Sequence, residues 1–150
     1  MAEIKNGNQF GKVNLTDIDD FEKHNNVQLP DDYRQFLIHY NGGKPVPNIE
    51  PTIRSDVQWI YGMVVEPYYA SLFQHLETFS GRIPSWYMPI ANDSGGNLYV
   101  MSLYAENHGT IAFWNHENEA DEGEADEYFD NMKFVAGSFT EFLNNLVANS

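Results

Sequence analysis

The chain of 150 residues contains no cysteine and carries 22 Asp and Glu against 8 Lys and Arg, a formal net charge of −14. This composition excludes disulfides, thiolate metal sites and a thiol nucleophile, while one domain of this length can bury about 70% of the surface that its unfolded chain exposes. The charge argues against direct binding of nucleic acids, because Lys and Arg drive that binding.

Two helices are predicted in the first third of the chain. In LTDIDDFEKHNN, Thr16 can cap a short helix that ends near Asn25 and Asn26. In LPDDYRQFLIHYNGG, Pro30 suits the first helical turn and the glycine pair marks the end of the helix. The i, i+3, i+4, i+7 spacing predicts the inward face of this second helix to be Tyr33, Phe36, Leu37 and Tyr40.

The middle of the chain is predicted to pass from a proline-rich loop into a strand at residues 57–61. A third helix is predicted over residues 69–79, closed by Gly81. Its expected inward residues are Leu72, Phe73, Leu76 and Phe79.

Three further strands are predicted at residues 88–91, 97–103 and 110–114. Turn residues separate them, so we expect an antiparallel meander. Ser138 and Glu141 form a capping-box pattern that opens a final helix. The apolar residues of this helix are Phe139, Phe142, Leu143, Leu146 and Val147. Helices on both sides of a central run of strands indicate an α+β fold.

The stretch ANDSGGN (residues 91–97) contains DSGG, which also surrounds the nucleophilic serine of trypsin-like proteases. Here Asn92 stands where that motif has glycine, and Asn97 stands where it has proline. Asn, Asp, Ser and Gly are also the residues that a tight turn requires. We therefore interpret the stretch as a turn between strands, with no catalytic residue at Ser94.

The segment between Arg82 and Lys133 contains ten acidic residues and no Lys or Arg. Aligning Gly123 with the glycine of an EF-hand loop puts Phe129 where a bidentate acid is required, so that calcium motif fails. His116 and Glu117 are adjacent and would point to opposite faces of a strand, so we expect no metal site. A mobile solvated loop and a docking surface for a basic protein both remain open for residues 117–130.

The remaining sequence signals point to no nucleotide or zinc chemistry. None of GxxxxGK[ST], GxGxxG and HExxH occurs. No stretch approaches the roughly 18 apolar residues of a membrane-spanning helix, and the start lacks a signal-peptide pattern. We therefore expect one cytoplasmic domain over residues 1–150 with no membrane partner, of which residues 1–14 are loosely ordered. Helical spacing does not assign five further aromatic residues to the core or to the surface: Trp59, Tyr61, Trp86, Tyr87 and Trp114.

Three segments, in this order along the chain, match the pattern of one known family. They are LPDDYRQFLIHYNGGKPVP (29–47), PIANDSGGNLYVMSL (89–103) and FVAGSFTEFLNNL (134–146). Together they resemble the SUKH superfamily, also called the Smi/Knr family. The intervening GTIAFWNHEN (109–118) is similar to the family's strand that runs into a histidine–acid step. The resemblance extends from about residue 15 to the C-terminus.

This resemblance implies a single SUKH-like domain, in which N-terminal and C-terminal helices pack on a mixed, mostly antiparallel sheet. It also implies a binding function without catalysis or cofactor. Bacterial members bind and neutralise a cognate polymorphic toxin, often a nuclease, and fungal relatives regulate cell-wall synthesis by binding partners. The residues that match the family's structural pattern are Leu29, Pro30, Tyr33, Phe36, Leu37, Asn41, Gly42, Gly43, Pro89, Ala91, Asp93, Gly95, Gly96, Phe139, Phe142 and Leu143.

The charge and the resemblance together favour an immunity protein whose acidic surface docks on the basic cleft of a nuclease toxin. The predicted partner-binding residues are Glu117, Glu119, Asp121, Glu122, Glu124, Asp126 and Glu127, with Trp114 or Trp59 as an apolar anchor. Two alternatives remain open. One is a regulatory or scaffolding module of the same family, and the other is a hydrolase built around Ser94 or the histidines.

Overall fold

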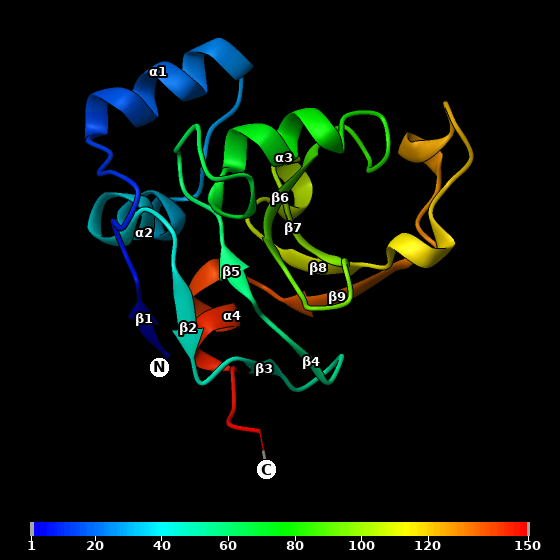
Figure 1. The fold of residues 1–150 in the computed structure, drawn as a ribbon. Coiled ribbons are helices and arrows are strands. Elements are labelled where there is room, and N and C mark those ends of the chain that lie inside the picture. The colour runs from blue at the N-terminus through cyan, green and yellow to red at the C-terminus, as the bar shows by residue number, and fades with distance from the viewer. Residues whose placement is uncertain (1, 150) are drawn as a thin grey trace.

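The computed structural model describes residues 2–149 and confirms an α+β fold (Figure 1). The helices are α1 (Leu15–Asn25), α2 (Asp31–Tyr40), α3 (Leu72–Thr78) and α4 (Phe139–Asn144). The strands are β1 (Glu3–Lys5), β2 (Lys44–Val46), β3 (Ile49–Glu50), β4 (Ser55–Asp56), β5 (Trp59–Ile60), β6 (Tyr87–Asn92), β7 (Leu98–Ser102), β8 (Ile111–Trp114) and β9 (Met132–Ala136). None of the helices in the described part of the chain combines the length and the apolarity needed to cross a membrane.

The start of α1 differs from the prediction. Its cap is Asn14, whose side chain accepts a hydrogen bond from the Asp17 backbone N–H at 2.9 Å. The Asp17 carboxylate accepts in return from the Asn14 N–H at 3.0 Å. This reciprocal capping box satisfies two backbone donors at the helix start, so Thr16 was the wrong cap. The helix ends as predicted, with Asn26 in the left-handed conformation.

Helix α2 confirms three of its four predicted inward residues. Tyr33, Phe36 and Leu37 are buried. Tyr40, in the last turn of the helix, is exposed, and its ring centroid lies 5.6 Å from that of Phe36. The helix stops at Asn41, whose backbone is left-handed and whose N–H donates to the Leu37 carbonyl at 2.9 Å.

The main sheet has the strand order β5-β6-β7-β8-β9, and all its neighbours are antiparallel. The predicted meander is therefore confirmed. Among residues 2–149, the one parallel pairing is an isolated bridge between Gly62 and Ser71. Two short antiparallel pairs, β1 with β2 and β3 with β4, lie beside this sheet.

Both faces of the main sheet are covered, as β7 makes clear. Tyr99 and Met101 belong to the large core cluster that also contains residues of α1, α2 and α4. Leu98 and Val100 point to the other face, where they join a smaller cluster with Phe79 and Trp114. Successive side chains of a strand point to opposite faces, so burial of every residue of β7 requires cover on both sides.

Several elements depart from the sequence prediction. The stretch predicted as a proline-rich loop contains the short strands β2, β3 and β4. The strand predicted at residues 57–61 is reduced to β5, and the helix predicted over 69–79 divides into a 3₁₀ turn at Tyr68–Ala70 and α3. Strand β9 was not predicted. Phe73 is 39% exposed instead of inward, and Val147 lies exposed beyond α4, where its backbone pairs with Ile49.

The stretch ANDSGGN forms the hairpin between β6 and β7, as predicted. Its buried Asp93 carboxylate accepts hydrogen bonds from the backbone N–H groups of Gly95 and Asn97, at 3.0 and 2.8 Å. It also accepts from the Ser55 hydroxyl at 2.7 Å, which ties the hairpin to β4. Asp93 is thus the organising residue of the turn.

Candidate functional site

The predicted acidic residues lie in one long connection between β8 and β9. We call residues 115–131 the acidic lobe, which projects from the sheet at the right of Figure 1. Two short 3₁₀ turns, His116–Asn118 and Ala125–Glu127, give it local structure. The Asn115 N–H donates to the Asn131 carbonyl and the Asn131 side chain donates to the Asn115 carbonyl, both at 2.9 Å. These bonds close the base of the lobe.

Two contacts fix the body of the lobe to the segment before β6. The Arg82 guanidinium donates to both carboxylate oxygens of Glu119, at 2.9 and 3.2 Å, and lies 4.5 Å from the centroid of the Phe79 ring. The Asp126 carboxylate accepts from the backbone N–H of Ser85 at 2.7 Å and from its hydroxyl at 3.1 Å. Bidentate arginine pairs hold a defined geometry, so the lobe has a preferred orientation on the domain.

The seven predicted acids therefore fall into two groups. Glu119 and Asp126 bind the domain itself and orient the lobe. The other five side chains are exposed, and among the described residues none of them has a hydrogen-bond or ion-pair partner. These five are Glu117, Asp121, Glu122, Glu124 and Glu127. They form an unneutralised negative surface.

The two tryptophans predicted as surface anchors were the wrong residues. Trp114 is 1% exposed and packs edge-to-face on Phe79, at 5.7 Å between ring centroids. Trp59 is 8% exposed and lies against Phe10 and Tyr69. Both side chains belong to the folded core and present no ring to a partner.

An aromatic patch that the sequence did not predict lies at the base of the acidic lobe. Trp86 contacts Tyr104 and Phe129, with ring centroids 6.0 and 5.9 Å apart. Phe129 and Phe134 line a shared hollow of 360 Å³, and Phe134 is 62% exposed. We call Trp86, Tyr104, Phe129 and Phe134 the aromatic patch. Large exposed aromatic side chains are typical anchors of protein interfaces, and Trp86 was among the aromatics that helical spacing left unplaced.

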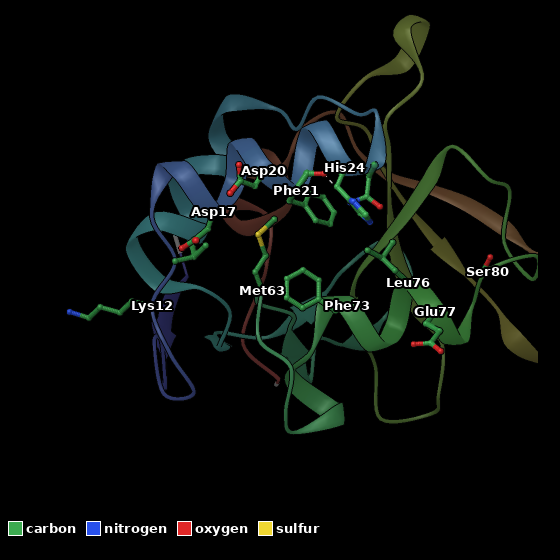
Figure 2. Close-up of a pocket in the computed structure, with 12 residues that line it drawn as sticks. Lys12, Asp17, Asp20, Phe21, His24, Met63, Phe73, Leu76, Glu77 and Ser80 are labelled. Atoms are coloured by element: carbon green, nitrogen blue, oxygen red, sulfur yellow. Dashed lines mark hydrogen bonds between the residues drawn. The ribbon is translucent and has the colours of Figure 1, made fainter.

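A groove of 1140 Å³ lies between α1 and α3. Figure 2 shows Phe21 of α1 facing Phe73 of α3 across it, with Met63 and Leu76 alongside. Asp17, Asp20 and Glu77 also line it. No sequence signal pointed to this groove, because its two walls are far apart in the chain.

The chemistry at Ser94 is that of a turn. Its hydroxyl donates to the Asp56 carboxylate at 3.1 Å, and its backbone N–H donates to the same oxygen at 2.9 Å. The nearby His116 ring nitrogen Nε2 lies 2.8 Å from the Gly95 carbonyl oxygen. Within residues 2–149, no three His, Asp or Glu side chains gather in a way that could hold a metal ion.

The residues matched to the family pattern occupy structural positions. Pro30 caps α2, and Asn41, Gly42 and Gly43 form the buried turn that follows it. Pro89 lies in β6, and Asp93, Gly95 and Gly96 form the hairpin. The others are buried in the large core cluster: Leu29, Tyr33, Phe36, Leu37, Ala91, Phe139, Phe142 and Leu143.

Comparisons with known proteins agree with this architecture. The family model described as the SMI1 / KNR4 family (SUKH-1) matches residues 12–145. The SPbeta prophage-derived uncharacterized protein YokK of Bacillus subtilis (strain 168) is 30% identical over 141 residues, an alignment that covers 80% of this chain and 67% of the relative. The chain therefore belongs to the SMI1/KNR4 family (SUKH-1).

Proposed function

We propose that this protein is a non-enzymatic immunity protein, which binds a cognate bacterial toxin in the cytoplasm and neutralises it. The acidic lobe and the aromatic patch form the proposed docking surface. Family membership supports an immunity-type role. The observation that carries the proposal is the set of five exposed, unpaired carboxylates on a lobe that Arg82 and Ser85 hold in place.

A nuclease is the toxin class that this surface fits best. The active cleft of a nuclease carries basic side chains that bind the phosphates of its substrate. The carboxylates of the acidic lobe would occupy the positions of these phosphates and exclude the nucleic acid. Close charge pairs across such an interface can couple by about 1.5 to 7 kcal/mol. The aromatic patch adds apolar anchors beside the charges, where Phe134 and Tyr104 are already exposed. Inhibition by occupancy needs no catalytic residue and no cofactor.

The proposal is tested by co-expressing the chain with the toxin domain encoded next to it, and by measuring cell survival and complex formation in a pull-down. We expect rescue and a stable complex. A lobe variant with Asp121→Asn, Glu122→Gln and Glu124→Gln should associate more slowly and should lose much of the salt dependence of association. A matched control with Glu3→Gln, Asp31→Asn and Glu66→Gln removes the same charge from other exposed positions.

Two outcomes would contradict this proposal in different ways. If both variants weaken binding equally, net charge acts without a defined surface, and the acidic lobe is not the docking site. If the folded wild-type chain neither binds the toxin nor rescues the cells, the regulatory or scaffolding role of the same family becomes the better explanation.

A further inference from the structure

The groove between α1 and α3 has an apolar floor that no other part of the described chain covers. The Phe21 and Phe73 rings face one another, with centroids 6.2 Å apart, and Met63 and Leu76 extend this surface (Figure 2). Phe73 remains 39% exposed although it lies on the wall of the groove. Phe21 and Met63 are themselves buried, so Phe73 and the half-buried Leu76 are the apolar side chains that remain accessible. Accessible apolar side chains with polar residues along their edges suit a binding surface.

The edges of the groove are negatively charged. Asp17 and Asp20 extend from α1, and Glu77 extends from α3 on the opposite edge. Asp17 serves the capping box of α1, whereas Asp20 and Glu77 have no side-chain partner among the described residues. Two basic side chains, Lys12 and His24, also line the groove, and the Lys12 ammonium points away from it in Figure 2. The charge therefore complements a basic occupant.

The walls of the groove favour an occupant that is itself helical. Backbone N–H and C=O groups in α1 and α3 are bonded within each helix, so neither wall offers a strand edge to an extended peptide. A helix satisfies its own backbone groups and needs only side-chain contacts.

We propose that this groove binds one amphipathic helix of a partner protein. Its apolar face lies over Phe73 and Leu76, and its Lys or Arg side chains lie beside Asp20 and Glu77. This inference goes beyond the proposed function, because no residue of the acidic lobe or of the aromatic patch lines the groove. The protein then has two separate docking surfaces, which can engage two partners or two parts of one partner.

The test uses a synthetic peptide of about 15 Leu and Lys residues in helical order, long enough to form a helix on binding. Its affinity is measured by fluorescence anisotropy, and its site is mapped by amide chemical shifts of the full chain. We expect saturable binding, with shifts concentrated in α1 and α3. The double variant Asp20→Asn with Glu77→Gln should bind about tenfold more weakly, the loss expected for two partly exposed charge pairs. Phe73→Ala should also weaken binding.

Two controls separate the groove from the general negative charge of the protein. The variant Glu3→Gln with Asp31→Asn removes the same charge from exposed positions outside both proposed docking surfaces and should bind the peptide as wild type does. A peptide of identical composition in scrambled order should bind at least tenfold more weakly, because it has no apolar face. Equal losses in both double variants, equal binding of both peptides, or shifts confined to residues 117–130 would each overturn the proposal.

Discussion

At the scale of single residues, Asp93 is the clearest structural determinant. Its carboxylate accepts from two backbone N–H groups, the Ser55 hydroxyl and the Asn97 side chain. Asp93→Ala would leave these donors without their acceptor, so we expect the free energy of unfolding to fall by about 3 kcal/mol. Urea denaturation measures this loss. Ser94→Ala, in the same turn, should cost less than about 1 kcal/mol, and equal losses would contradict the assigned role of Asp93.

A second residue-scale prediction concerns Gly62, where the chain passes directly over the turn after α2. A Cβ at this position would overlap the carbonyl oxygen of Asn41 and lie 2.7 Å from its carbonyl carbon. Both atoms belong to the backbone and cannot rotate away, so Gly62→Ala should cost about 2 kcal/mol or more. Thermal unfolding checks this. Gly137→Ala is the control, because its nearest neighbour is the carboxylate end of the exposed Glu141 side chain at 3.1 Å.

The buried tryptophans show why sequence predicted some faces and not others. Helical spacing fixed the inward face of α2, because a surface helix has one apolar side and one polar side. The strand IAFW (β8) has no such contrast, since both of its faces are buried. Its sequence could not distinguish a buried Trp114 from an exposed one. Phe134 was missed for the opposite reason: it lies exposed on a short edge strand that the sequence did not predict.

At the scale of elements, the start of α4 was predicted correctly at Ser138, whose side chain accepts from the Glu141 N–H at 3.0 Å. The start of α1 was not, because Asn14 and Thr16 are both residue types that cap helices and the sequence does not decide between them. The acidic lobe was predicted only as a charged segment. Its orientation comes from Arg82 and Ser85, which precede it by 37 and 41 residues in the two contacts. Charge patterning within the lobe contains no information about these distant partners, so neither its order nor the neighbouring aromatic patch could be inferred.

The contact between Arg82 and Glu119 gives a prediction for the lobe as a unit. Both side chains are partly exposed, so Arg82→Ala should change global stability by less than about 1 kcal/mol. Locally, however, it removes a bidentate tether, and we expect amides of residues 116–131 to exchange with deuterium several-fold faster. Mass spectrometry of the exchanged peptides measures this. Arg34→Ala removes the ion pair to Asp19 elsewhere and should leave the lobe unchanged. Equal exchange of the lobe in both variants would refute the tether.

At the scale of the whole molecule, His75 links folding to pH. The ring is 3% exposed and stacks between Tyr61 and Tyr68, at 3.8 and 4.3 Å between centroids. Its Nδ1 lies 2.7 Å from the Ser71 carbonyl oxygen, to which it donates. Burial lowers the pKa of His75 below the ordinary value, because the charged imidazolium loses its hydration in the folded protein.

This lowered pKa predicts a loss of stability in mild acid. As pH falls below about 6.5, the unfolded chain protonates this histidine before the folded protein does, so protons favour unfolding until the folded pKa is reached. Above that window the neutral ring contributes its full stability. His75→Gln removes this titration, and the difference in unfolding free energy between wild type and the variant should shrink as pH is lowered from 7 to 5. Urea denaturation at each pH measures this difference. The contributions of the carboxylates cancel in it, because both proteins contain the same carboxylates. A His75→Gln curve parallel to wild type would show that burial of this ring is not linked to protonation.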